Sequence, residues 1–153
     1  MNLKYQQEFI SQVKSECQSL IELHWEEIAL YKDKIKLNPD WESYHTYEEN
    51  NLLRIFTARN EDVLVGYFVA VLQKNMHYKD HIFACNDILY LHEDYRKGFA
   101  GIHLLKFAEE MLKEDGVSVM LINTKIHKPL DKILERLKFN PIERVYSKYL
   151  GSD

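Results

Sequence analysis

The spacing of apolar residues changes near residue 51, and this change constrains the fold more than any other feature of the chain. Between residues 10 and 28, apolar residues recur at steps of three and four, which is typical of an amphipathic helix or of two short helices in succession. The runs 52–59 and 63–73 are instead rich in β-branched and aromatic residues and flank a polar triplet, which predicts a hairpin. Helical and strand-like segments in one chain predict an α/β fold.

The rest of the chain continues this alternation. We expect a short helix and loop at 38–51, and strands at 82–91, 117–123 and 142–150. An amphipathic helix around Leu104–Leu112 ends at Gly116, and another around Leu130–Leu137 begins after Pro129. No Pro/Gly-rich linker divides the sequence, so we predict a single domain over residues 1–153, with helices covering a mixed sheet.

Composition excludes several classes of protein. Hydrophobic residues make up 46% of the chain and charged residues 29%, a balance typical of globular proteins. The net charge of −4 lacks the basic excess of a nucleic-acid-binding protein. The longest apolar run, 63–72, is too short to cross a bilayer, and the first residues lack the apolar core of a secretory signal. We therefore predict a cytoplasmic protein with no membrane or nucleic-acid partner. The sequence leaves open whether the protein forms a homodimer.

The junction at Leu89–Leu105 carries the strongest chemical signal. An apolar strand runs through a basic, glycine-containing loop at 96–101 into a predicted helix. Backbone N–H groups at such a helix start, next to Arg96 and Lys97, form a site for an anion such as a diphosphate. The alternative is an ordinary glycine turn with two solvated cations. Neither a P-loop nor a dinucleotide-binding glycine pattern is present.

The run Ile88–Leu105 resembles the acetyl-CoA-binding segment of the GNAT N-acetyltransferases. In that family an apolar strand precedes Arg/Gln-x-x-Gly-x-Gly/Ala and a helix that opens with paired leucines. Aligned on Arg96 without gaps, Gly101 matches the second glycine, whereas Phe99 replaces the first. The order of elements also agrees, and Leu137–Phe139 resembles the family's closing Leu-Gly-Phe, with lysine in place of glycine. The chain is similar to short members encoded by bacteriophages.

The resemblance implies a mostly antiparallel central sheet and acetyl-CoA as co-substrate, with no metal. The strand before the loop would be bulged, and its backbone would hold the pantetheine arm and the thioester carbonyl. The cofactor-binding residues implied in this way are Leu89, Tyr90, Leu91, Arg96, Lys97, Gly98, Phe99, Ala100, Gly101 and Asn123.

Transfer to an amine also needs a group that accepts a proton. Asp87, on the cofactor strand, is the first candidate base and Glu27 the second. His24, Trp25 and Glu27 lie on the helical segment that walls the acceptor site in the family, although core packing or solvation would explain them equally well. The family often protonates the departing thiolate with a tyrosine, but Leu134 stands at that position. Tyr146 or Tyr149 on the predicted final strand could substitute as the donor, although strand tyrosines are more often packing residues.

Two functions follow from these residues. The first is an N-acetyltransferase that moves an acetyl group directly from acetyl-CoA to a primary amine of an unidentified acceptor. The alternative is a GNAT-like module that binds acyl-CoA with little or no turnover and acts through protein–protein interaction. Phe99 and Leu134 motivate this alternative, because each replaces a residue typical of the family.

Overall fold

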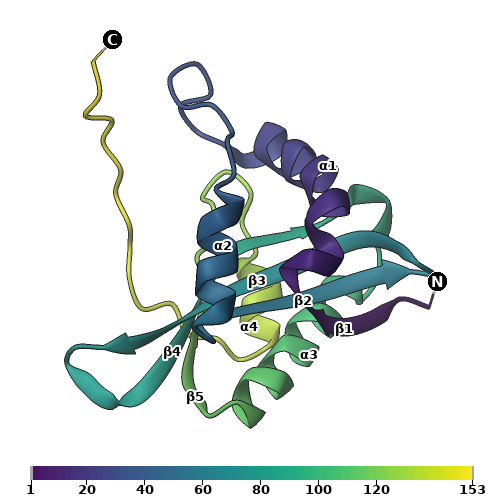
Figure 1. The fold of residues 1–153 in the computed structure, drawn as a ribbon, viewed down its shortest axis with the longest axis vertical. Coiled ribbons are helices and arrows are strands. Elements are labelled where there is room, and N and C mark those ends of the chain that lie inside the picture. The colour runs from purple at the N-terminus through teal and green to yellow at the C-terminus, as the bar shows by residue number, and fades with distance from the viewer. Residues whose placement is uncertain (1, 153) are drawn as a thin grey trace.

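One five-stranded sheet with helices on both faces forms the body of the protein (Figure 1). The computed structural model describes residues 2–152. The strands lie side by side in chain order, from β1 at one edge to β5 at the other. Their bounds are β1 Lys4–Glu8, β2 Leu53–Asn60, β3 Val63–Asn75, β4 Tyr78–Leu91 and β5 Val117–Leu121; the helices are α1 Ile10–Ile28, α2 Trp41–Glu49, α3 Ala100–Glu114 and α4 Asp131–Arg136, with a short 3₁₀ helix, η1, at Glu93–Tyr95.

The predicted fold class is confirmed. Strands β1 to β4 pair antiparallel, whereas β4 and β5 pair parallel because α3 crosses over the sheet between them. The predicted hairpin is β2–β3, which turns at Glu61 with a positive φ of 54°. The predicted mostly antiparallel sheet flanked by helices is therefore the observed one.

The sheet separates two apolar cores. Helices α3 and α4 cover one face, where Leu104 and Leu112 pack against Phe56 and Phe68. Helix α1 covers the other face, where its buried stripe packs against Ile55, Tyr67 and Tyr90. Neighbouring residues of β2 thus serve different cores, as the two-residue period of a strand requires. Residues 10–28 form one continuous helix, which settles the open choice between one helix and two.

Strand β1 was not predicted, because its sequence Lys-Tyr-Gln-Gln-Glu carries no apolar alternation. A buried ion pair fastens it to the sheet instead. Arg59 donates to both carboxylate oxygens of Glu8, at 2.9 and 3.1 Å, and Thr57 donates to the same carboxylate. Burial would raise the pKa of Glu8, but these hydrogen bonds outweigh it and lower that pKa.

The predicted final strand at 142–150 is wrong. Residues 139–150 have no regular secondary structure, and they run away from the sheet past α2 (Figure 1). A strand needs a neighbour to satisfy the hydrogen bonds of its backbone, and no strand among residues 2–152 pairs with this segment.

None of the helices in residues 2–152 has both the length and the hydropathy that a membrane-spanning helix needs.

Candidate functional site

A β-bulge interrupts β4 at Asp87. Val69 of β3 faces Ile88, whereas the next residue, Ala70, faces Asn86, so Asp87 is one extra residue in β4. A bulge turns two successive side chains toward the same face. Ile88 contributes to the core under α1, and the Asp87 side chain therefore also faces α1 and α2.

Strands β4 and β5 part immediately before this bulge. Their last paired residues are Cys85 and Leu121, although β4 continues to Leu91. The side chain of Asn86 bridges the point of separation, because it accepts from the backbone N–H of Asn123 at 2.7 Å and donates to the carbonyl of Asn123 at 3.3 Å. We call this opening, bounded by residues 86–91 and by Asn123, the β4–β5 split.

The split leaves backbone groups of β4 without a strand partner. The N–H of His92 donates to Val65 of β3 at 2.8 Å, and backbone direction alternates along an antiparallel strand. The N–H and carbonyl of Tyr90 therefore point to β3, whereas those of Leu89 and Leu91 point into the split. The carbonyl of Leu91 accepts from Nε of Arg96 at 2.7 Å. Leu89 is thus the residue of this strand best placed to bind a ligand through its backbone.

The start of α3 fits an anionic group. Its first three N–H groups have no intrahelical acceptor, its N-cap residue Phe99 supplies no capping side chain, and its first turn holds no acidic residue. A Cβ added at Gly98 or Gly101 would have no heavy atom within 4 Å, apart from its neighbours in the sequence and the backbone of its own helix. Gly98 has a φ of +81°, which favours glycine. The residues present therefore suit a diphosphate, as the resemblance implies.

Phe99 does not block this turn. Its side chain is 58% exposed. The centroid of its ring lies 6.3 Å from the centroid of the His103 ring and 5.9 Å from Cζ of Arg136. Lys97 is exposed next to it and adds positive charge near the helix start. The family's first glycine is thus replaced by a residue that packs against α3 and α4.

The structure brings Arg96 and Glu27 together as an ion pair. Nη1 and Nη2 of Arg96 donate to the two carboxylate oxygens of Glu27 at 2.7 and 2.6 Å, a bidentate geometry. These bonds hold the pKa of Glu27 below its usual range. Lys128 adds a weaker contact at 3.9 Å. Glu27 therefore fastens the end of α1 to the loop that follows β4.

Asp87 meets a tyrosine from α2. The hydroxyl of Tyr44 donates to Oδ2 of Asp87, whose side chain is otherwise exposed. Burial and the neighbouring carboxylate both raise the pKa of Tyr44, so its hydroxyl keeps its proton. Helix α2 is held in place because Glu48 accepts from the backbone N–H of Ile10 at 2.9 Å. The carboxylate of Asp87 is thus fixed beside the split but open to solvent.

His24 is 7% exposed and belongs to the core under α1. Its Nδ1 lies 3.2 Å from the hydroxyl of Tyr67, and its ring stacks on Tyr90 with a centroid distance of 5.0 Å. Burial lowers the pKa of His24 to about 4, despite the opposing charge of Glu27. The guanidinium of Arg96 lies over the Tyr90 ring at 5.3 Å. His24 and Tyr90 therefore connect α1 to β4 through their rings.

Two predicted residues, Trp25 and Tyr146, lie elsewhere. Trp25 lines a pocket between α1 and the following loop with Leu23 and Leu37. Tyr146 is 86% exposed on the segment that leaves the sheet, so it is not brought to the split. Leu134, which stands where the resemblance places the family's tyrosine, is buried in the core under α3 and α4.

Tyr44 and Asn86 lie within the site but were not predicted from the sequence. Tyr44 belongs to a short polar helix, and nothing in its spacing indicates that it reaches β4, 43 residues later. Asn86 and Asp87 form a polar pair in an otherwise apolar strand, and such a pair is a usable signal for a bulge.

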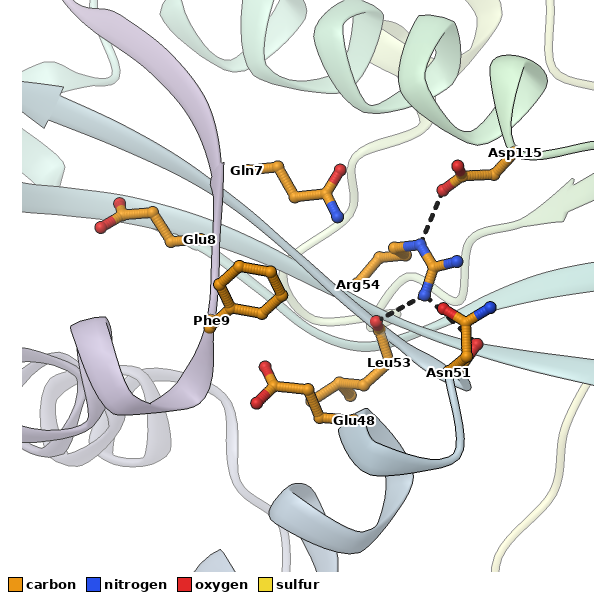
Figure 2. Close-up of a pocket in the computed structure, with 8 residues that line it drawn as sticks. All are labelled: Gln7, Glu8, Phe9, Glu48, Asn51, Leu53, Arg54 and Asp115. Carbon is orange, nitrogen blue, oxygen red and sulfur yellow. Dashed lines mark hydrogen bonds and ion pairs between the residues drawn. The ribbon is translucent and has the colours of Figure 1, made fainter.

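Another pocket lies at the opposite edge of the sheet (Figure 2). Arg54 projects into it but is bound by Asp115 at 2.6 Å and by the carbonyls of Leu53 and Asn51 at 2.9 and 3.2 Å. These bonds join β2 to the end of α3, which is a structural role. Within residues 2–152 no group of three or more His, Cys, Asp or Glu side chains could hold a metal ion.

Comparison with known proteins supports the same interpretation. A family model described as the acetyltransferase (GNAT) family matches residues 17–139. No curated protein matches the sequence. The similarity to bacteriophage-encoded members stays a prediction, which the family model does not test.

Several solved structures share the fold. An aminoglycoside acetyltransferase from an uncultured soil metagenomic sample, in complex with sisomicin, is 17% identical, with a TM-score of 0.73 over 99% of this chain and 97% of that one. Glucosamine-6-phosphate N-acetyltransferase from Arabidopsis thaliana is 11% identical, with a TM-score of 0.73 over 99% and 100%. A predicted acetyltransferase with acetyl-CoA from Clostridium acetobutylicum is 12% identical, with a TM-score of 0.68 over 97% of each chain.

The bulged strand, the open helix start and the family match over most of the length agree with one another. The chain belongs to the GNAT acetyltransferase family.

Proposed function

We propose that this protein is an N-acetyltransferase that moves an acetyl group directly from acetyl-CoA to a primary amine. The observation that carries the proposal is the β4–β5 split, which presents unpaired backbone groups of Leu89 next to the uncapped start of α3. Acetyl-CoA supplies the activated acetyl group. The family match supports acyl transfer, and the proposal adds the cofactor and the class of acceptor.

The cofactor would be held by backbone groups more than by side chains. The N–H groups of Ala100 and Gly101 at the start of α3 would bind the diphosphate, with Lys97 adding positive charge. Leu89 and the free N–H of Leu91 would bind the pantetheine arm. Arg96 would act through its backbone and through its bond to the Leu91 carbonyl, since its guanidinium is engaged by Glu27.

We assign to Asp87 the role of orienting the amine and accepting its proton. The bulge turns its carboxylate to the face covered by α1 and α2, and Tyr44 fixes one of its oxygens. Glu27 is the weaker candidate base, because its bond to Arg96 lowers its pKa and occupies both oxygens. We assign protonation of the thiolate to water, because Leu134 is buried and Tyr146 lies on the outward segment.

The acceptor we propose is a cationic amine. A negatively charged Asp87 that is open to solvent attracts a positively charged group, and ten acidic against five basic residues among the first 50 favour the same charge. Similar folds are described for enzymes named for aminoglycosides, glucosamine 6-phosphate and the alanine of a ribosomal protein. Sisomicin, glucosamine 6-phosphate and a peptide with an N-terminal alanine therefore form the first acceptor panel.

The test combines cofactor binding with turnover. Titration calorimetry should show acetyl-CoA binding to the pure protein, and thiol release should show multiple turnovers with a cationic acceptor. Asp87→Asn should lower kcat by about 100-fold or more while leaving the Kd for acetyl-CoA unchanged. Asp80→Asn, an exposed change on the same strand, is the matched control and should leave both values unchanged.

Two outcomes would count against the proposal. Absence of acetyl-CoA binding at millimolar concentration would remove the enzyme and the binding module together. Binding without turnover across the panel, combined with capture of a specific protein partner, would favour the alternative module, for which the buried Leu134 is the supporting observation.

A further inference from the structure

The segment 142–150 has the composition of a strand but lies outside the sheet. Its apolar side chains are mostly solvent-exposed: Ile142 69%, Val145 78%, Tyr146 86% and Leu150 85%. β-Branched and aromatic residues favour a pleated, half-buried environment. Burying side chains of this kind stabilises a protein, and this chain leaves four of them in water within nine residues.

The sheet, in turn, has an edge that suits such a segment. β5 pairs only with β4, and on its other side no strand lies among the described residues 2–152. An edge strand presents a row of unpaired N–H and carbonyl groups. The two edges differ in sequence, since β1 is Lys-Tyr-Gln-Gln-Glu and β5 is Val-Ser-Val-Met-Leu. The polar β1 discourages pairing, whereas the apolar β5 favours it.

The segment is held away from the β5 of its own chain. Ser147 lies within hydrogen-bond distance of Tyr31, at 3.1 Å, and the rings of Tyr149 and Tyr31 are 5.9 Å apart. Lys34 lies over the Tyr149 ring at 4.9 Å. These contacts direct the segment outward along the α1–α2 side, beyond α2 and opposite the body of the sheet (Figure 1).

We propose that residues 142–150 add as a sixth strand to the β5 edge of a second copy of this chain, and that the exchange is reciprocal. Each copy then covers the open edge of the other and buries the other's apolar segment. Because both segments and both edges are used, the assembly closes as a two-fold dimer and does not grow into a fibre. The proposal rests on the segment and the edge alone, and it is independent of the proposed acetyl transfer.

The first experiment measures mass in solution. Light scattering after size exclusion should give the full chain at micromolar concentration about twice its monomer mass of 18.3 kDa. Val145→Pro removes one backbone donor from the segment and should give a monomer. The tryptophan fluorescence of this variant should be unchanged, because Val145 is exposed and the core around Trp25 and Trp41 stays intact. Val145→Ile, the matched control that keeps a β-branched side chain, should remain a dimer.

The second experiment locates the contact. Amide hydrogen exchange should be slow at 117–121 and at 142–150 in the wild-type dimer, and fast at both in Val145→Pro. A wild-type protein that stays monomeric at hundreds of micromolar would overturn the proposal, and slow exchange at both segments in that monomer would indicate pairing within one chain. A dimer that survives Val145→Pro would also overturn it, since another surface would then form the contact.

Discussion

His24 is a buried histidine that stays neutral, and its burial makes the stability of the protein depend on pH. Its pKa is lowered to about 4 in the folded chain from 6.5 in the unfolded chain. The unfolded chain therefore binds more protons between these values, and the folded state loses stability as the pH falls through this window. From these two values, lowering the pH from 7 to 5 should cost about 2 kcal/mol of unfolding free energy through this residue.

Urea unfolding of the wild type and of His24→Phe at pH 7 and pH 5 tests this expectation. The variant loses the contact with Tyr67, so it should be less stable at pH 7, but its stability should fall less between the two pH values. His77→Gln, a change of an exposed histidine in the β3–β4 turn, should keep the wild-type dependence. Equal slopes for the wild type and His24→Phe would contradict the assignment.

At the scale of single residues, the sequence predicted positions better than partners. Asp87 was predicted from its place on the strand before the loop and Asn123 from the family resemblance, and both lie at the split. The ion pair between Glu27 and Arg96 joins residues 69 positions apart, and no local pattern indicates such a contact. Tyr44 was not predicted to reach Asp87, because only the packing of α2 decides which of its side chains does so.

At the scale of elements, the start of α3 lacks a stabilising charge, as the proposed diphosphate site requires. Gly101 lies in the first turn, where an acidic side chain would complement the helix dipole. Gly101→Asp should therefore raise the unfolding free energy by about 0.5–1 kcal/mol. The same charge should repel a diphosphate and raise the Kd for acetyl-CoA at least about 10-fold. Denaturation and calorimetry on one preparation measure both effects.

Gly101→Asn is the matched control for that change, because it has a side chain of the same size without the charge. It should leave acetyl-CoA affinity closer to the wild type than Gly101→Asp does. Equal loss of affinity in both variants would mean that side-chain size blocks the site, and the electrostatic argument for α3 would then fail.

Strand β3 approaches the end of β4 closely at Gly66. A Cβ at this position would lie 2.7 Å from Cδ1 of Leu91 and 2.9 Å from the carbonyl oxygen of Tyr90. Gly66→Ala must therefore displace the end of β4, at a cost of about 1–3 kcal/mol in unfolding free energy. It should also weaken acetyl-CoA binding, since Leu89 and Leu91 move with the strand. Gly101→Ala, which meets no atom within 4 Å, should not destabilise the fold and is the control.

The elements themselves were mostly predictable, and the two errors share a cause. β1 was missed because its five residues show no apolar alternation and are held by the Glu8–Arg59 pair. The segment 142–150 was predicted as a strand because its composition favours one, yet no strand pairs with it within residues 2–152. Strand formation depends on a partner as much as on propensity, and single-sequence patterns do not report the partner.

At the scale of the whole molecule, one sheet joins two cores, so we expect the two faces to unfold together. Leu104 is fully buried under α3, and Leu104→Ala should cost about 2–5 kcal/mol by leaving a cavity. The two tryptophans, Trp25 and Trp41, lie on the other side, on α1 and α2. Their fluorescence therefore reports on the face that this substitution does not touch.

Because β2 sends Phe56 to one core and Ile55 to the other, damage to either core removes support from the same strand. Leu104→Ala should thus lower the urea midpoint measured by tryptophan fluorescence as much as the midpoint measured by circular dichroism. Leu20→Ala, on α1, is the matched change on the opposite face and should also shift both midpoints together. A fluorescence midpoint that stays at the wild-type value in Leu104→Ala, while the circular dichroism midpoint falls, would show that the α1 face folds independently of the α3 face.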